Sequence, residues 1–283
     1  MKNMNNGSKM GLALGDRLNS SYLKSFSING LFGYKDVKIP FEKEALILIS
    51  ENGFGKTIVL DTLYYSISGQ YYKLSNIEFE SVVIEFISGK VVEIKKEDLK
   101  LPFNKDFSSK AIQSASKESI LCFTADRRAE KELQNLGYDF TPFGMLVSLY
   151  QQKKKIDNSL NRFVQICNKY LYKKKIVYDE DNVDISIIET RNNSLIDFSN
   201  LSSGEKQIVS IFGKIYLGPS EDIIVLFDEP ELSLSIEWQA SLFPDILKSN
   251  KVKLLLATTH SPFIFDNELG QNAQDLGTFV WES

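Results

Sequence analysis

Apolar and polar residues alternate along much of the first hundred positions of the chain. A strand points successive side chains to opposite faces, so a period of two indicates strands with one buried face. Gly30, Gly33 and Gly89 lie between the alternating runs and are typical of turns that join such strands. We therefore predict an antiparallel β lobe built from four runs, residues 22–28, 36–41, 82–87 and 91–94.

A second pattern consists of short, continuous apolar runs next to helical periods. Residues 44–50 contain Ala-Leu-Ile-Leu-Ile, which predicts a buried strand, followed by a glycine-containing loop and a helix that opens at Lys56. Alternating strands and helices predict a parallel sheet covered by helices. This order returns in the C-terminal part as helix, strand, helix and strand, at residues 208–217, 223–227, 235–247 and 252–257.

The segment between these parts, at about residues 96–180, is rich in Lys and Ser and has mainly a helical period. The residues 183, 185 and 187 then alternate as in a strand. We find no internal repeat and no heptad run longer than two turns, so we expect no long coiled coil. One helical face carries the apolar residues Phe163, Ile166, Cys167, Tyr170 and Leu171.

Composition narrows the possible classes of protein. A net charge of −4 and an isoelectric point near 5.3 exclude a wholesale nucleic-acid binder but leave room for a local basic patch. Two cysteines in 283 residues indicate a reducing cytoplasm rather than a disulfide framework. Residues 1–21 lack the apolar core of a signal peptide and predict a flexible arm. No run approaches the roughly 18 apolar residues that span a bilayer, so we expect a cytoplasmic protein without membrane contact.

Residues 50–57, Ser-Glu-Asn-Gly-Phe-Gly-Lys-Thr, lie between a buried strand and a helix, as a phosphate-binding loop does. Backbone N–H groups of the loop and the helix N-terminus would hold the β- and γ-phosphates. Lys56 would bridge these phosphates, and the Thr57 hydroxyl would ligate Mg²⁺. Ser50 stands where the motif usually has glycine, so an ordinary glycine turn is the alternative. The residues assigned to nucleotide binding are Asn52, Gly53, Gly55, Lys56 and Thr57.

Residues 223–229, Ile-Ile-Val-Leu-Phe-Asp-Glu, predict an apolar strand that ends in two acids. Asp228 would contact Mg²⁺ or its water, because ligands of a parallel sheet collect at the carboxyl ends of the strands. Glu229 would polarise the attacking water as a general base. The alternative is a pair of acids that cap a strand in a turn.

Residues 201–207, Leu-Ser-Ser-Gly-Glu-Lys-Gln, come just before an apolar helix. Ser202, Gly204 and the amides beside them could form a second anion site, although the same residues also make a good N-cap. This turn is too far along the sheet to reach the phosphates held by Lys56. It would instead cover the γ-phosphate bound by another subunit.

His260 is the only histidine of the chain, within Thr-Thr-His-Ser-Pro at 258–262. A lone histidine is often structural. Here it follows a strand expected beside the strand of Asp228, so its imidazole could donate a hydrogen bond to a γ-phosphate.

Taken together, these motifs resemble those of ABC-type ATPases, in the OLD/AAA-like branch that is related to SMC and repair ATPases. The resemblance covers about residues 22–95 and 195–269, and it rests on the order and spacing of the motifs at 201–207, 228–234 and 259–262. It implies an α/β fold, a P-loop ABC ATPase head with a mixed or parallel sheet, an antiparallel β lobe and a short helical insertion. Glu229 and His260 would be its catalytic residues, and ATP and Mg²⁺ its cofactors.

The same resemblance implies a head-to-tail dimer or a higher oligomer of the chain. ATP would lie between Lys56 of one subunit and Ser202 of the other, and residues 231–235 would form the D-loop between the two sites. We divide the chain into an arm, 1–21, and a single ATPase domain, 22–283. Its parts are a β lobe with the phosphate loop, a mainly helical insertion, and a lobe with the signature turn, the Walker B strand and His260, at 22–100, 101–195 and 196–283.

A narrower similarity connects the chain with ATPases of bacterial anti-phage systems of the PARIS, Septu and retron-linked types. It rests on a Thr-x-x-Arg-Arg-x-Glu element at 124–130 and on the runs at 231–239 and 261–266. It implies a sensor or scaffold that holds a separate effector protein, such as a nuclease. Two other hypotheses stay open: a repair or chromosome-maintenance ATPase that acts directly on DNA, and a nucleotide-binding scaffold that hydrolyses almost nothing.

For some residues the sequence is compatible with more than one role. Arg127 and Arg128 either pair with nearby glutamates or reach a nucleotide or the facing subunit. The basic residues between 153 and 175 form a solvated helical face, a contact for DNA or a phage component, or a contact for an acidic partner. Phe32 and Tyr34 are the candidates to stack on adenine, with core packing as the alternative.

Overall fold

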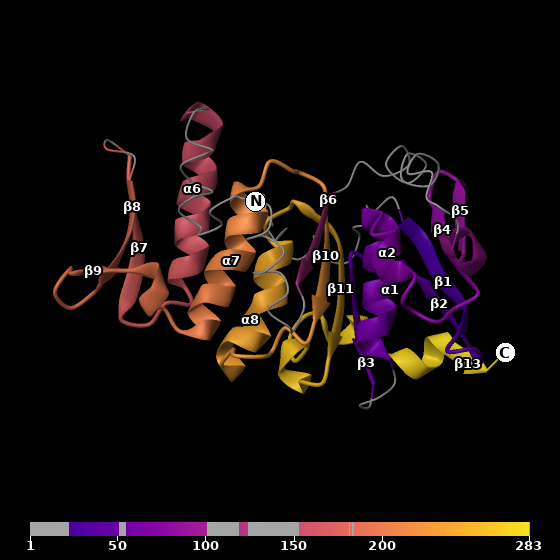
Figure 1. Cartoon of the computed structure of the whole chain (residues 1–283). Coiled ribbons are helices and arrows are strands. Elements are labelled where there is room, and N and C mark those ends of the chain that lie inside the picture. Colours follow the sequence, from indigo (N-terminus) through magenta and orange to yellow (C-terminus); the bar gives the residue numbers. More distant parts are fainter. Residues whose placement is uncertain are drawn as a thin grey trace, which may run out of the picture.

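The structure is a computed structural model that describes residues 23–50, 55–100, 119–123, 153–180, 182 and 184–282. Side chains are described in the same ranges except at 100, 119–123 and 153–157. The described residues form three β-sheets with helices between and beside them (Figure 1). Several features that the sequence singled out lie outside the described ranges: the arm at 1–21, Asn52 and Gly53, the element at 124–130 with Arg127 and Arg128, and residue 183.

The alternating N-terminal residues form the predicted antiparallel lobe. Its strands are β1 (Leu23–Leu31), β2 (Lys35–Pro40), β4 (Ser81–Phe86), β5 (Val91–Lys95) and β13 (Val280–Glu282). They pair antiparallel in the order β13-β2-β1-β4-β5. The alternation buries one face, on which Phe26, Ile28 and Ile84 are fully inaccessible. The C-terminal strand β13 was not predicted, because its partner β2 lies at the other end of the chain.

The central sheet is the parallel sheet that the apolar runs predicted. Its strands are β3 (Ala45–Ile49), β6 (Ser119–Phe123), β10 (Ile223–Asp228), β11 (Val252–Thr259) and β12 (Ala273–Asp275). The order is β12-β3-β11-β10-β6, and all four pairings are parallel. The carboxyl ends of these strands therefore meet at one edge, where the loops that follow β3, β10 and β11 lie together.

Both faces of the central sheet are buried, and successive residues divide between them. Even-numbered residues such as Leu226 and Leu256 face a core with the antiparallel lobe and α1 (Lys56–Ser68). Odd-numbered residues such as Phe227 and Leu255 face a second core. That core is built from the helices α6 (Lys153–Asn168), α7 (Ser203–Leu217) and α8 (Ile236–Leu247), which stack on the other side of the sheet (Figure 1).

The mainly helical insertion that we expected at 101–195 is described only in part. In its described residues, α6 is the one helix, while β6 belongs to the central sheet and three more strands form a separate antiparallel sheet. These strands are β7 (Lys174–Asp179), β8 (Asp184–Glu189) and β9 (Leu195–Ile196). A short apolar run such as β6 lacks alternation, so its period cannot distinguish a strand from a helix.

The remaining elements are short. They are α2 (Tyr71–Leu74) and five 3₁₀ turns, η1 (Lys96–Lys100), η2 (Phe198–Asn200), η3 (Pro262–Ile264), η4 (Gly270–Asn272) and η5 (Leu276–Phe279). Among the described residues, no helix is long and apolar enough to cross a bilayer.

Candidate functional site

The candidate site lies at the carboxyl edge of the central sheet. The register pairs Thr259 of β11 with Ile49 of β3 and Thr258 with Asp228 of β10, so the polar residues after these strands meet at one level. The helix α1 opens immediately beyond β3. Its N-cap is Gly55, whose φ of 90° is a left-handed conformation that glycine adopts without strain.

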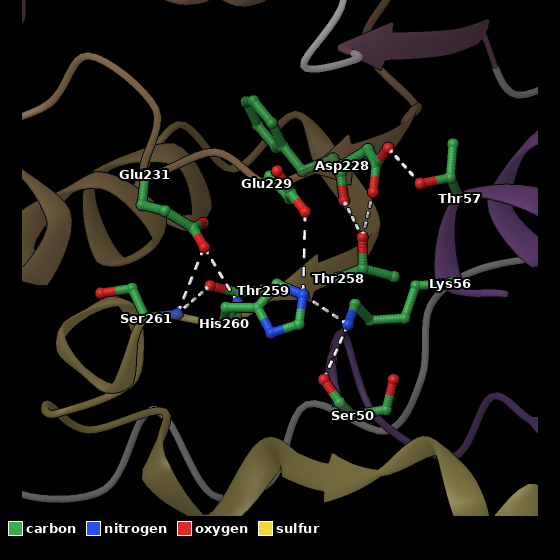
Figure 2. A network of polar contacts seen from close by, with 11 residues as sticks. Ser50, Lys56, Thr57, Asp228, Glu229, Glu231, Thr258, Thr259, His260 and Ser261 are labelled. Atoms are coloured by element: carbon green, nitrogen blue, oxygen red, sulfur yellow. Dashed lines mark hydrogen bonds and ion pairs between the residues drawn. The ribbon is translucent and has the colours of Figure 1, made fainter. Parts of the chain in front are cut away.

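Lys56 reaches back from the first turn of α1 into the centre of this edge. Its ammonium donates to the backbone oxygen of Ser50 at 2.7 Å and lies 2.6 Å from Nε2 of His260 (Figure 2). Burial lowers the pKa of Lys56, while the charges of Glu229, Asp228 and Glu231 act in the opposite direction. The ammonium is thus the single cationic group among three carboxylates in this part of the described site.

The contact between Lys56 and His260 defines the hydrogen bonding of the imidazole. An ammonium group has three donors and no acceptor, so Nε2 of His260 is the accepting atom when the lysine carries its charge. Glu229 Oε1 lies 3.8 Å from the same Nε2, which is too far for a hydrogen bond. The histidine therefore stands between the lysine and the glutamate and is bonded to the lysine.

Asp228 is held by two hydroxyl groups from different elements. Thr57 Oγ1 donates to its Oδ2 at 2.8 Å, and Thr258 Oγ1 donates to its Oδ1 at 2.6 Å (Figure 2). Oxygen ligands of this kind suit Mg²⁺, which takes one or two protein ligands beside phosphates and water. Among the described residues, no group of three or more His, Cys, Asp or Glu could hold a metal ion by itself.

Glu229 follows at a sharp bend. Its φ of 48° is left-handed, which is costly for a residue with a side chain and is common at functional sites. Its N–H donates to the backbone oxygen of Thr258, so the bend is tied to β11 at 3.0 Å. The side chain is one third exposed, which leaves its carboxylate open to a water molecule.

The signature turn is a separate structure at the start of α7. Ser202 is the N-cap, and its side chain accepts from the N–H of Glu205, whose carboxylate accepts from the N–H of Ser202 at 2.7 Å. This reciprocal capping box confirms the N-cap interpretation of the turn. No hydrogen bond or ion pair of the described residues connects Ser202 with Lys56, Asp228 or His260.

Two contacts fix the signature turn from outside. Lys174 of β7 donates to both carboxylate oxygens of Glu205, at 2.8 and 3.1 Å. A Cβ on Gly204 would lie 2.3 Å from the backbone oxygen of Ser233, in the loop that follows β10. That approach leaves no room for a side chain, so Gly204 has a packing role beside the phosphate role that the sequence predicted.

The structure thus brings together five predicted residues, Lys56, Thr57, Asp228, Glu229 and His260, with Gly55 at the helix start. Two polar residues that the sequence did not assign, Thr258 and Gln239, also belong to the region, together with Glu231 from the expected D-loop. The position of Thr258 directly after an apolar strand was an available signal. Ser50 is not among the described non-glycine residues with positive φ, so replacement of the usual glycine needs no left-handed backbone there.

The structure also shows the surroundings of two other predicted features, Phe32 and the basic residues between 153 and 175. Phe32 packs its ring at the position that a Cβ of Gly55 would approach, 3.6 Å away, and is 37% exposed, so it borders the phosphate loop. Of the basic residues between 153 and 175, Lys169 pairs with the buried Asp245 and Lys174 with Glu205. Both lysines hold neighbouring elements together, but the side chain of Lys169 remains 52% exposed, while that of Lys174 is 24% exposed.

Comparison with known proteins identifies the family of the chain. The family model described as "AAA domain, putative AbiEii toxin, Type IV TA system" matches residues 75–266, which include the signature turn, β10 and His260 and begin after the phosphate loop. No curated protein matches the chain.

Two solved structures have a fold similar to that of this chain. "Crystal structure of the SmcHead bound to the C-winged helix domain of ScpA" matches with 14% identity over 86% of this chain and 90% of that chain, at a TM-score of 0.55. An Smc head domain with an extended coiled coil, bound to the C-terminal domain of ScpA derived from Pyrococcus furiosus, matches with 14% identity over 86% and 91%, at a TM-score of 0.51. The predicted α/β ATPase-head fold is confirmed by these matches.

Proposed function

This chain belongs to the AAA domain family whose model matches residues 75–266, and it is a P-loop ATPase of the AAA/SMC-head type. We propose that it binds Mg-ATP at Lys56 and hydrolyses it. The observation that carries the proposal is the convergence of Lys56, Thr57, Asp228, Glu229 and His260 at one sheet edge. An ammonium, two oxygen ligands for a hard cation, a carboxylate and an imidazole are the groups that phosphoryl transfer requires.

Each residue has a role in this proposal. Lys56 holds the β- and γ-phosphates from the N-terminus of α1, where the helix dipole also favours an anion. Thr57 and Asp228 would hold Mg²⁺, which would neutralise charge on the phosphates. Glu229 accepts a hydrogen bond from the attacking water and orients it. His260 lies next to Lys56, and its imidazole would donate a hydrogen bond to the γ-phosphate.

A second copy of the chain completes the site in this proposal. Ser202 caps α7 without contact to the phosphate-binding residues of its own chain among the described hydrogen bonds, and it is exposed. Its hydroxyl and the free N–H groups of the helix start suit an anion brought by another molecule. This supports a head-to-tail dimer, or a higher oligomer, with ATP between Lys56 of one subunit and Ser202 of the other.

For the biological role, we propose a sensor or scaffold of a bacterial anti-phage complex that holds a separate effector protein. The family description, which names a toxin of a type IV system, supports it, and so do Smc heads of this fold solved with ScpA bound. The alternative is a repair or chromosome ATPase that acts directly on DNA. DNA-stimulated turnover with a steep salt dependence would favour that alternative, and salt-resistant association with a protein partner would favour the scaffold.

The substitution Glu229→Gln tests the proposed catalysis. It keeps the shape of the side chain but removes the base, so we expect kcat for ATP hydrolysis to fall about 10²- to 10⁴-fold while ATP still binds. The variant should then accumulate as an ATP-bound assembly, measured as mass in solution. Glu268→Gln, at an exposed carboxylate away from the site, is the matched control and should hydrolyse ATP like the wild type. Rapid turnover by Glu229→Gln would remove the base role.

A further inference from the structure

We propose that Glu231 is a positioning residue for the histidine loop: it fixes the backbone of His260 and so sets where the imidazole meets the γ-phosphate. This inference rests on the proposed ATP hydrolysis and extends it to a residue that touches neither nucleotide nor metal ligand. Glu231 lies two residues after Glu229, in the loop that follows β10, and His260 lies in the neighbouring loop after β11.

The contacts are direct. Oε1 of Glu231 accepts from the backbone N–H of His260 at 2.9 Å and from that of Ser261 at 3.2 Å (Figure 2). A carboxylate that accepts two successive N–H groups fixes both peptide planes, because charge-assisted hydrogen bonds are stronger and more directional than neutral ones. The orientation of the bond from Cα to Cβ of His260 is thereby fixed.

A second residue binds the same two loops together. Ser261 Oγ donates to Oε1 of the buried Gln239, at 2.6 Å, and the Gln239 amide donates to the backbone oxygen of Leu234 at 3.0 Å. Leu234 in turn donates its N–H to the backbone oxygen of Glu231. The loop after β10 and the loop after β11 therefore form one hydrogen-bonded unit, in which Glu231 contributes the contact next to the histidine.

Placement of the imidazole requires this contact because the histidine side chain is held at its tip by Lys56 alone among the described hydrogen bonds. His260 itself is about one third exposed, so surrounding packing does not immobilise the ring. Loss of the Glu231 carboxylate would free the backbone at residues 260 and 261 and let the ring move. A shift of about 1 Å in a group that contacts the reacting phosphate costs about 10²-fold in rate.

A further property of the Glu231 carboxylate allows an effect on kcat to be distinguished from an effect on folding stability. Its second oxygen, Oε2, is buried and has no hydrogen-bond partner among the described residues. In Glu231→Gln the amide oxygen can still accept the two N–H groups, while the amide nitrogen takes the buried position without an acceptor. We expect this variant to lose stability, because unpaired buried donors are costly, and yet to retain most of its kcat.

The test is a double-mutant cycle on kcat for ATP hydrolysis by the full chain, with Glu231→Ala, His260→Ala and the double variant. If Glu231 acts through His260, Glu231→Ala alone lowers kcat by about 10²-fold, and it lowers the rate no further once His260 is alanine. The KM for ATP should change far less than kcat, since the lysine and the magnesium ligands stay. Glu237→Ala, an exposed carboxylate on the first turn of α8, is the control and should leave kcat unchanged.

A purely structural role gives a different result. Losses in kcat that multiply in the double variant, an unchanged kcat in Glu231→Ala, or a Glu231→Gln variant as slow as Glu231→Ala would each overturn the positioning role. If Glu231→Ala does not fold, Glu231→Asp replaces it in the cycle, because the shortened carboxylate keeps the charge but withdraws from both N–H groups. A wild-type chain without ATP turnover would instead overturn the proposed function itself.

Discussion

The phosphate site and the signature turn fix their functional residues in two different ways. Lys56, Asp228 and His260 come from three elements far apart in the sequence, and contacts between these elements hold them. Ser202 is held by Glu205, three residues away, in a local capping box. The first site exists only when the central sheet has formed, while the second needs only the start of a helix.

The signature turn nevertheless depends on the tertiary structure for its place. Gly204 rests against the backbone of Ser233, and Lys174 pairs with Glu205 from another sheet. Ser233 belongs to the same loop as Glu229. The conformation of the signature turn is therefore local, whereas neighbouring elements set its position relative to the phosphate site. The following substitutions separate these two contributions.

Removal of the lysine should have the largest effect. Lys56→Ala deletes the one ammonium at the centre of the site, so ATP affinity should fall by about 10²-fold or more, the equivalent of roughly 3 kcal/mol for lost charge-assisted bonds. Equilibrium binding of a fluorescent ATP analogue measures it. Lys95→Ala, an exposed lysine on β5, is the control and should bind normally. Unchanged affinity in Lys56→Ala would refute the phosphate-loop assignment.

A methyl group at the signature glycine should have the next largest effect. Alanine normally stabilises a helix relative to glycine, yet Gly204→Ala puts its Cβ 2.3 Å from the Ser233 oxygen, so we expect a loss of about 1–3 kcal/mol in the free energy of unfolding. Gly213→Ala on the same helix meets only the ring of Phe163 at 3.8 Å and should be neutral or stabilising. Urea denaturation measures the free energy of unfolding of both variants. Equal stabilities would mean that the loop with Ser233 moves to make room for the added methyl group.

The smallest effect concerns the ion pair that holds the signature glutamate. Burial raises the pKa of Glu205, but the bonds from Lys174 and from Ser202 outweigh it, so the net pKa is lowered. A lowered carboxyl pKa contributes stability above the unfolded-state pKa that is lost as the pH falls through the folded-state pKa. Lys174→Met should therefore cost about 0.5–1.5 kcal/mol in unfolding free energy at neutral pH.

The pH dependence supplies the control for this variant. The difference in stability between the wild type and Lys174→Met should shrink in acid, as Glu205 becomes protonated in both proteins. Lys175→Met, the exposed neighbour on the same strand, should change stability little at any pH. A difference between the wild type and Lys174→Met that is constant from neutral to acid pH would indicate lost packing of the lysine stem instead of a lost charge pair.

Much of the fold could be predicted because its signals are local. The period of two at β1, β2, β4 and β5 and the apolar runs of β3, β10 and β11 reflect burial on one face or on two. Two of the strands that were missed, β6 and β13, lack this signal. β6 is five residues without alternation, and β13 is three residues whose role depends on pairing with β2. The charge on Lys174 looked like a surface feature because nothing local indicates the buried Glu205 opposite it.

The sequence by itself determined the chemical groups of this protein and the elements that carry them: a glycine-bordered lysine at a helix start, acids after an apolar strand, and a histidine after another. Strand ends and helix starts are encoded by near neighbours in the chain. The tertiary structure alone decided which groups meet, such as Thr258 with Asp228 and Glu231 with the backbone of His260. These contacts join loops about 30 residues apart, and their geometry follows from the parallel register of β10 and β11, which no local pattern specifies.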